Sequence, residues 1–546
     1  MLATVLACHA VSGQATLSPE KIASLKEEVL REVDKQAPLA QQINDMLFSF
    51  AELGFQEFET QTYLTQLLEK NGFKIQKGIA NIPTAWTASW GNGKPVIALG
   101  SDVDCIPKAS QKPGVAYWDP IVEGAPGHGE GHNSGQALNI VTALVVKKIL
   151  EREKLSGTLM LWPGIAEEQL GTKAYYIREG FFKNVDACIF THVGSNFFVS
   201  YGDAGSTGLV SVKFDFDGQA AHAGGAPWRG RSALDAVELM NVGWNYKREH
   251  LPLTQRSHYV IPDGGDQPNV VPSKASVWYY FRERTYTDIK KLFDTGLKMA
   301  EGASLMTDTK FSYQILGSAW PGHFNKPMAT AMYQNIKKVG LPKWSDDDQL
   351  LAKAAQIELK ATKVEGLPVK LDTIGVPDDA KPELKGLIGQ SLIPLRGGSD
   401  DIADISWNVP TIVLYYPSNI PGLPGHHWSN AISMATPIAH KGIVAGAKVE
   451  GLTLIDLFTS PDLVSQSQAY FKDIQTKDIQ YTPLMRPEDK PAVFLNKGIM
   501  AQFKPQLQKT YYNPAKYKSY LEQLGITYPT VRQDQRDAIN KLKESK

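Results

Sequence analysis

The sequence contains few cysteines and, after its first residues, no long apolar run. Its 546 residues include three cysteines, Cys8, Cys105 and Cys188, and no two of them form a Cys-x-x-Cys pair. We therefore expect neither a disulfide scaffold nor a zinc ribbon with thiolate ligands. A membrane-spanning helix needs about 20 consecutive apolar residues, so we expect a soluble chain without a membrane partner. Apolar residues make up 42% of the composition, which is enough for a large packed core.

An excess of charge of either sign is also absent. Lysine plus arginine and aspartate plus glutamate both number 57, so the formal net charge is +0. No overall field attracts nucleic acid or an anionic membrane, and neither is expected as a partner. The length predicts about three to four domain-sized units, or fewer with insertions.

The first 15 residues are apolar and then small, and they end in Gly13-Gln14-Ala15. That ending suits a signal-peptidase site, although no basic segment precedes the apolar one. We predict a signal peptide over residues 1–15 and a periplasmic or secreted protein. The alternative is a cytoplasmic protein with a frayed amino terminus.

A glycine-rich loop at residues 126–133, Pro-Gly-His-Gly-Glu-Gly-His-Asn, carries two metal-binding side-chain types. Its alternating glycines leave room for Glu130 and His132 to converge on one point. From Ser134 the sequence becomes apolar with helical spacing, so the loop opens a buried helix. A catalytic zinc ion takes about three protein ligands, so further donors must come from elsewhere in the chain.

Imidazole and carboxylate groups also follow several predicted buried strands. In open α/β sheets, ligands bind beyond the carboxyl ends of the strands. Each such group alone could be a polar turn or a solvated surface, but their recurrence favours one site. Adjacent acids face different ways, so one can bind a metal while its neighbour moves a proton. The groups at or after predicted strands are Asp102, Asp104, Glu167, Glu168, His192 and His426.

Residues 206–318 differ in pattern from the rest of the chain. They predict elements in the order β-α-β-β-α-β, which is that of a small ferredoxin-like unit inserted into a larger domain. The predicted elements are strands 208–216, 257–262, 276–282 and 310–316 and helices 232–250 and 287–303. The predicted divisions are a catalytic domain in two parts, 16–205 and 319–455, the inserted unit 206–318, and a carboxy-terminal extension, 456–546.

Four polar residues of the inserted unit are candidates for function. His222 stands among small residues and Asn269 precedes two valines, so residue chemistry alone favours a packed surface residue for the first and a strand start for the second. Arg229 and Arg231 are candidate partners for a substrate carboxylate, although Arg231 could also support the start of a helix.

Ordered short motifs between about Phe50 and Ala447 match one known family. They are Ser101-Asp102-Val103-Asp104-Cys105-Ile106-Pro107, Gly131-His132-Asn133, Glu167-Glu168, Ala221-His222-Ala223, Gly230-Arg231-Ser232-Ala233-Leu234-Asp235-Ala236-Val237, Pro268-Asn269-Val270-Val271, Asp404-Ile405-Ser406-Trp407 and Ile438-Ala439-His440-Lys441-Gly442. With them the chain resembles the aminoacylase and carboxypeptidase-like dinuclear metallopeptidases. It is most similar to their amidohydrolase branch, which includes the aminobenzoyl-glutamate and indole-acetyl-amino-acid hydrolases.

The resemblance implies an α/β fold: a catalytic domain with a mixed sheet and an inserted ferredoxin-like lid and dimerisation domain. It implies two divalent metal ions, Zn or Mn, and a homodimer. The metal ligands that it implies are Glu130, His132, Glu168, His192 and His426.

The resemblance also implies roles for residues around the metal ligands. Glu167 would be the general base, and Asp104 would orient the imidazole of His132. His222 would reach the active site of a partner subunit and stabilise the oxyanion there. Asn269 would help to hold the substrate.

Two positions depart from the family pattern. The amidohydrolase branch usually has a cysteine, shared between two metals, where this chain has Glu130. A carboxylate can also bridge two ions, and its harder oxygen favours Zn or Mn over softer ions. Asp102 stands where some branches place a histidine ligand, so it is either a ligand or a bystander that Asp104 makes unnecessary.

These features predict a metal-dependent hydrolase of the amide bond in N-acyl or N-aroyl amino acids, of the aminobenzoyl-glutamate type, or in small peptides. The alternative is an impaired family member that binds such molecules without hydrolysing them, because Glu130 disturbs the two-metal centre. Nucleotide binding is disfavoured because the spacing of Gly127, Gly129 and Gly131 is one residue short of the dinucleotide fingerprint. A serine hydrolase is disfavoured because no Gly-x-Ser-x-Gly motif occurs.

Overall fold

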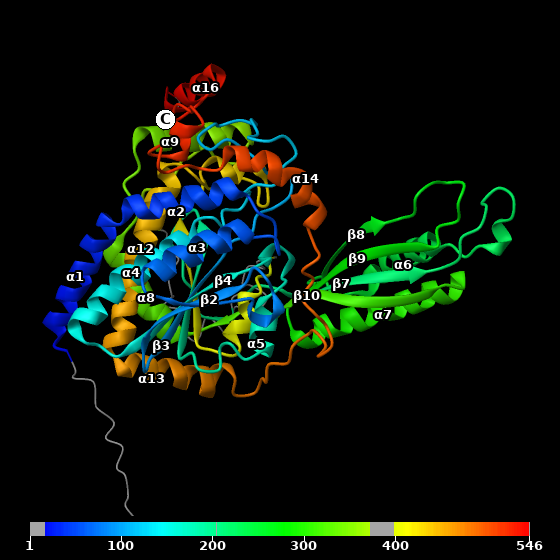
Figure 1. The fold of residues 1–546 in the computed structure, drawn as a ribbon, viewed down its shortest axis with the longest axis horizontal. Coiled ribbons are helices and arrows are strands. Elements are labelled where there is room, and N and C mark those ends of the chain that lie inside the picture. Colours follow the sequence, from blue (N-terminus) through cyan, green and yellow to red (C-terminus); the bar gives the residue numbers. More distant parts are fainter. Residues whose placement is uncertain (1–16, 204, 372–397, 545–546) are drawn as a thin grey trace, which may run out of the picture.

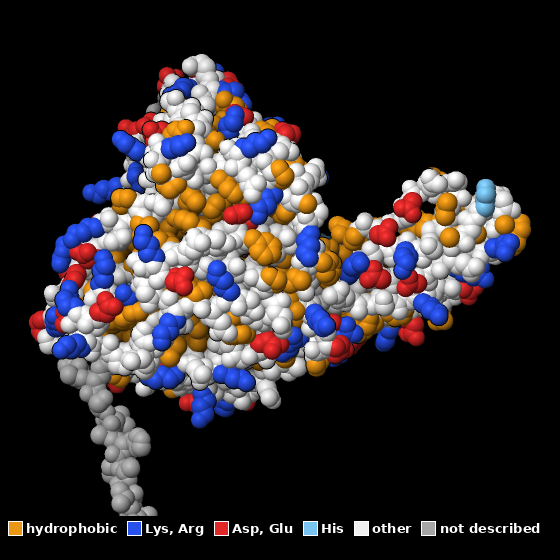
Figure 2. Space-filling model, in the orientation of Figure 1, with side chains coloured by type: hydrophobic (Ala, Val, Ile, Leu, Met, Phe, Trp, Pro, Cys, Tyr) orange, Lys and Arg blue, Asp and Glu red, His pale blue; other side chains and the backbone are white. Residues whose placement is uncertain are grey.

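The computed structural model describes residues 17–203, 205–371 and 398–544, which form a large α/β body and a narrower arm (Figure 1). The predicted signal peptide, residues 1–15, lies outside the described residues and stays a prediction. Within the described ranges, no helix combines the length and apolarity that a membrane crossing requires. Basic and acidic side chains are interspersed on the face drawn in Figure 2.

A six-stranded mixed sheet forms the centre of the body. In spatial order its strands are β1 (Lys74–Lys77), β2 (Trp86–Asn92), β4 (Gly157–Gly164), β3 (Val96–Asp102), β5 (Ala187–Gly194) and β12 (Thr411–Pro417). Neighbours among β4, β3, β5 and β12 are parallel, whereas β2 is antiparallel to both β1 and β4. The four parallel strands therefore present their carboxyl ends along one edge of the sheet.

Helices cover both faces of this sheet. One face is covered by α3 (Phe58–Lys70), α4 (Gly135–Glu153), α8 (Lys326–Val339) and α12 (Pro437–Thr459). Helices α1 (Pro19–Lys35) and α2 (Ala37–Phe50) pack onto α4 and α12. The other face packs against α5 (Lys173–Arg178) and α11 (Ile402–Ser406). Helix α4, which follows the glycine loop, is buried along nearly its whole length, as its apolar sequence predicts.

The arm is a four-stranded antiparallel sheet with two helices on one face. Its strands lie in the order β10-β7-β9-β8. The elements are β7 (Gly208–Asp217), α6 (Ala233–Lys247), β8 (Arg256–Asp263), β9 (Lys274–Glu283), α7 (Tyr286–Thr307) and β10 (Lys310–Ala319). The predicted β-α-β-β-α-β order and the predicted fold class are confirmed. Because burial alternates along β9, Tyr279 and Phe281 face the helices while Tyr280 and Arg282 face the opposite way.

The arm joins the body through two segments that lie side by side. Strand β6 (Gly202–Asp203) leads into the arm, and β11 (His323–Phe324) follows it. The two short strands pair with each other in antiparallel register, His323 opposite Asp203. The chain therefore leaves the body and returns to it at one place, where β6 and β11 pair.

The carboxy-terminal residues return across the body. They form α13 (Pro461–Tyr470), α14 (Lys497–Leu507), α15 (Tyr520–Gln523) and α16 (Gln533–Glu544), and α16 lies against α9 (Asp346–Glu358). The predicted division between residues 455 and 456 falls inside α12, which runs to Thr459. This extension also contacts the arm, because the guanidinium of Arg486 lies 4.4 Å from the ring centroid of Tyr313.

Candidate metal centre

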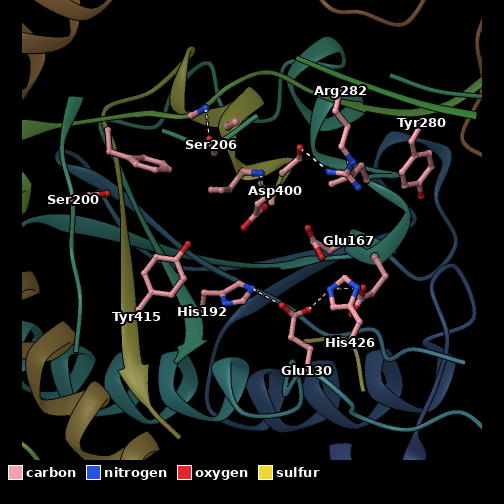
Figure 3. Close-up of a pocket in the computed structure, with 18 of the residues that line it drawn as sticks. Glu130, Glu167, His192, Ser200, Ser206, Tyr280, Arg282, Asp400, Tyr415 and His426 are labelled. Carbon is pink, nitrogen blue, oxygen red and sulfur yellow. Dashed lines mark hydrogen bonds and ion pairs between the residues drawn. The ribbon is translucent and has the colours of Figure 1, made fainter. Parts of the chain in front are cut away.

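A cavity of about 480 Å³ lies where the carboxyl edge of the body sheet meets the base of the arm (Figure 3). Both regions contribute to its wall. Among the lining residues are Glu130, Glu167, Glu168, His192 and His426 from the body and His258, Tyr280 and Arg282 from the arm.

The glycine loop passes through a tightly packed part of the body. A Cβ atom at Gly131, whose φ is +128°, would lie 2.3 Å from the sulfur of Met434 and 3.0 Å from Val193. The glycine is therefore needed so that the backbone fits between its neighbours. We expected the glycines to relieve crowding between Glu130 and His132, but at this position the constraint is packing against the surrounding body.

Glu130 is the centre around which three imidazoles gather. Its Oε2 lies 3.1 Å from Nε2 of His132 and 3.5 Å from Nε2 of His426, and its Oε1 lies 3.8 Å from Nε2 of His192. Oε2 of Glu168 lies 3.5 Å from the same nitrogen of His426. The structure thus brings all five predicted ligands together, and Figure 3 shows three of them, Glu130, His192 and His426. Burial opposes ionisation of Glu130, but the imidazoles, His132 foremost, outweigh it and hold its pKa well below the usual range.

Two of the imidazoles are oriented by backbone carbonyls. Nδ1 of His132 lies 3.2 Å from the carbonyl oxygen of Asp104, and Nδ1 of His192 lies 3.0 Å from that of Val193. A proton on each Nδ1 leaves Nε2 as the lone-pair donor toward Glu130. The predicted contact between Asp104 and His132 is present, and the Asp104 carboxylate is slightly farther from Nδ1, at 3.4 Å.

The donor set fits divalent cations. Among the described residues, several buried atoms at the centre make no hydrogen bond, although such atoms are rare in folded proteins. They include Oδ2 of Asp102, Oδ1 of Asp104, Oε2 of Glu130, Nε2 of His132 and Oε1 of Glu168. Imidazole nitrogen and carboxylate oxygen are the donors that Zn and Mn take in proteins. Bound cations would coordinate atoms that make no hydrogen bond within the described part of the chain.

Glu167 and Glu168 share one turn, but they do not point apart as we expected of adjacent acids, because one carboxylate oxygen of each lies within 4.8 Å of the other and of donor atoms of Glu130 and His132. The turn begins at Ala166, whose φ is +51°, and the amide of Ala166 donates to Oε1 of Glu57 at 3.0 Å. Both side chains line the cavity, with Oε2 of Glu168 3.5 Å from Nε2 of His426 and Oε2 of Glu167 4.0 Å from Nε2 of His132. Burial raises the pKa of Glu167 well above its usual range, with Asp400 and Asp102 adding to the effect.

Asp102 has a partner that the sequence did not reveal. Its Oδ1 lies 2.7 Å from Nζ of Lys173, and both side chains are buried. The same ammonium contacts Asp401 at 2.5 Å and Asp400 at 3.3 Å. Lys173 stands at the start of a short helix, where the sequence does not indicate that a lysine is buried. The aspartates that it contacts are 71 to 228 positions away in the sequence.

A second missed residue is Arg282, which reaches the cavity from β9. Its Nη1 donates to Oγ of Ser399 at 2.9 Å, and its guanidinium lies 5.3 Å from the ring centroid of Tyr280. The alternation of side chains along a strand could have predicted that Arg282 lies on the face of β9 opposite to Phe281. The arginines that we considered for this role, Arg229 and Arg231, do not line the cavity, because they lie in the loop after β7, at the far end of the arm.

His222 and Asn269 also lie at the far end of the arm, outside the cavity of their own chain. The amide of Ala223 donates to the carbonyl of Asn269 at 3.0 Å, so the two loops are tied together. The amides of Gly224 and Gly225 donate to Nδ1 of His222 at 3.2 and 3.0 Å. With Nδ1 as acceptor, the neutral imidazole carries its proton on Nε2, which can donate to another molecule.

Comparisons with known proteins place these features in context. Residues 204–302 match the peptidase dimerisation domain, M20_dimer. Over 472 residues the chain is 31% identical to one of the subunits of the p-aminobenzoyl-glutamate hydrolase of Escherichia coli, covering 84% of this chain and 98% of that protein. It is 27% identical over 339 residues to Xaa-Arg dipeptidase of Mus musculus, covering 61% of this chain and 75% of that protein.

One solved structure shares the fold over most of its length. The aminobenzoyl-glutamate utilization protein from Klebsiella pneumoniae matches with a TM-score of 0.53 and 16% identity, covering 78% of this chain and 97% of that chain. At this identity the match concerns the fold alone.

Proposed function

This chain belongs to the M20 peptidase family, and on that premise we propose that it is a metal-dependent amidohydrolase. Its substrates would be N-acyl or N-aroyl amino acids or small peptides. The observation that carries the proposal is the convergence of Glu130, His132, Glu168, His192 and His426. All of them except His132 line one cavity, which Glu167 also lines. The names of two relatives, an aminobenzoyl-glutamate hydrolase and a dipeptidase, support this substrate class.

The geometry supports two cation positions on either side of Glu130. One would use His132 and His192, and the other would use Glu168 and His426, with a carboxylate oxygen of Glu130 available to each. Divalent cations held there would polarise the substrate carbonyl and lower the pKa of a water molecule. Zn and Mn both suit this mixture of nitrogen and oxygen donors.

We assign the proton transfer to Glu167. The support is its position in the wall of the cavity, beside the proposed ligands. Its raised pKa suits a carboxylate that accepts a proton from the attacking water and returns it to the leaving amine. A carboxylate with an ordinary pKa would hold that proton less well.

Arg282 is placed to bind the amino-acid half of the substrate. It is a cationic side chain that lines the cavity from the arm, and Ser399 fixes its orientation. A guanidinium binds a carboxylate through paired charge-assisted hydrogen bonds. We propose that it recognises the free carboxylate of the substrate.

A homodimer would bring a partner's His222 and Asn269 to the cavity. The support is the match to the peptidase dimerisation domain and the exposed apolar side chains of the arm. Trp228 is 75% exposed and Val260 is 58% exposed, and Figure 2 shows hydrophobic side chains at the outer end of the arm. Strand β8 is also an edge of its sheet, where a second copy could pair.

The function is tested by two measurements on the purified protein. Elemental analysis should find divalent metal, and the metal-loaded protein should release amine from at least one member of a panel. The panel contains p-aminobenzoyl-glutamate, an indole-acetyl amino acid, a benzoyl amino acid and several dipeptides. Metal binding without amine release from any of them would favour the alternative, a protein that binds such molecules without hydrolysing them.

A further inference from the structure

We infer that Asp102 is a further metal ligand, at the cation position of Glu130, His132 and His192. The inference rests on the proposed metal centre and adds a residue to it. Asp102 ends strand β3, is 1% exposed, and has two oxygens in very different surroundings. Oδ1 accepts a hydrogen bond from Lys173 at 2.7 Å, whereas Oδ2 is buried and makes no hydrogen bond among the described residues.

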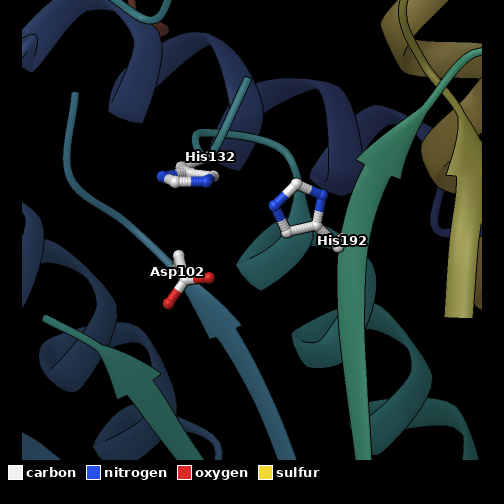
Figure 4. Close-up of side chains that lie close together, drawn as sticks. All are labelled: Asp102, His132 and His192. Atoms are coloured by element: carbon white, nitrogen blue, oxygen red, sulfur yellow. The ribbon is translucent and has the colours of Figure 1, made fainter. Parts of the chain in front are cut away.

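The surroundings of Asp102 include two of the proposed ligands. Each of Asp102, His132 and His192 has a donor atom that lies within 4.8 Å of a donor atom of the other two. Figure 4 shows the carboxylate and the two imidazoles around one space. A cation in that space would give the buried oxygen the partner that the protein does not supply.

Pairing with Lys173 does not by itself explain the second oxygen of Asp102. Asp401 contacts the same ammonium and is equally buried, yet both of its oxygens are used. Its Oδ1 pairs with Lys173 Nζ, and its Oδ2 accepts from the amides of Thr172 and Lys173 at 3.3 and 3.1 Å. The two aspartates thus share the ammonium of Lys173, but of the two only Asp102 keeps a buried oxygen without a hydrogen bond.

Lys173 then serves as the outer partner of a metal-binding carboxylate. Such partners fix the orientation of the ligand. Gly164 contributes by leaving space, because a Cβ there would lie 1.7 Å from Oδ1 of Asp102. The cluster holds one ammonium against three carboxyl groups, those of Asp102, Asp400 and Asp401.

The test compares cation binding by the wild type with binding by D102N and D401N. Metal-free protein is titrated with Co²⁺, and the visible d–d bands report the geometry of the bound ion. We expect two equivalents in the wild type and a loss of at least about tenfold in affinity for one of them in D102N, since even outer partners are worth about that much. In D401N both equivalents should bind as in the wild type, because Asp401 has no free oxygen toward the centre.

The outcomes separate this inference from the proposed function. If D102N binds two equivalents with wild-type affinity and spectrum, or if D401N loses as much affinity, the inference is wrong and the metal centre still stands. If the wild type binds no cation, the proposed function itself fails. D102N should fold, since Lys173 keeps Asp400 and Asp401 as partners, and thermal unfolding of the metal-free protein checks this.

A measurement on the wild type needs no variant. A crystal structure of the protein loaded with Zn²⁺ should place Oδ2 of Asp102 about 2.0–2.2 Å from the ion beside His132 and His192. An ion at that position without a bond to Asp102 would overturn the inference.

Discussion

The metal centre and the far end of the arm both carry residues expected to act in catalysis, but the two regions are built in opposite ways. His132 is 4% exposed, and each of its ring nitrogens has a neighbouring donor or acceptor group. His222 is exposed, and its contacts are to the backbone of its own loop. We therefore expect one chain to supply all the proposed metal donors, and we propose that the end of the arm acts in catalysis only beside another copy.

The largest expected effect is at the centre, for Glu167→Gln. Loss of the general base should lower kcat by about a hundred- to ten-thousand-fold. The amide cannot accept the proton, but it leaves the proposed ligands in place, so the metal content should stay at the wild-type value. Amine release and elemental analysis on one preparation give both results. A variant with near-full activity would exclude Glu167 as the base.

The matching change at the end of the arm is His222→Ala. Loss of an oxyanion donor should lower kcat by about a hundred- to a thousandfold. Because the side chain is exposed, the thermal unfolding temperature and the metal content should not change.

Mixing the two inactive variants sharpens the comparison. If His222 acts in the partner's cavity, Glu167→Gln and His222→Ala protomers should form hybrid dimers with one intact site, and activity should return after the protomers exchange. Each variant mixed with itself is the control. No recovery in a mixture shown to contain hybrid dimers would contradict the assignment across the dimer.

Arg282 lies between the two regions, since it belongs to the arm but lines the cavity. Arg282→Gln should raise KM about 10- to 100-fold, the equivalent of one charged hydrogen bond of about 1.5–3 kcal/mol, with a smaller change in kcat. The control is a substrate whose carboxylate is replaced by an amide, for which wild type and variant should differ little. An equal rise in KM with both substrates would mean that Arg282 does not bind the substrate carboxylate.

The smallest effect concerns the core of the body, at Glu450 of α12. Burial raises the pKa of this carboxyl from 4.5 to about 8. Between those values the folded protein binds more protons than the unfolded chain, so the free energy of unfolding falls as pH rises. Glu450→Gln should reduce that fall, which urea unfolding at about pH 5 and about pH 9 can measure. An unchanged pH dependence would contradict the raised pKa.

Much of the fold and of the donor set could be predicted because the signals are local. Buried parallel strands are short apolar runs, and the groups at their ends, such as Glu168 and His192, meet at one edge whatever the details of packing. The order of elements in the arm follows from strand and helix periods alone.

The missed features depend on contacts between distant positions. From its sequence neighbours alone, Lys173 is expected to be exposed to solvent. Its burial is explained by its contacts with Asp102 and Asp401. In the sequence, Arg282 is a single charged residue in a predicted strand. Its place in the cavity depends on how the arm packs against the body. The need for Gly131 likewise comes from Met434, which is 303 positions later in the sequence.

The paired strands β6 and β11 give the chain a modular construction. Because the two connections emerge next to each other, the arm could be excised and the cut ends bridged by a few residues without rerouting the rest of the chain. The same body could therefore carry arms of different size or edge. Gain or loss of such a module would change the quaternary organisation while the donors at the ends of β3, β4, β5 and β12 keep their framework.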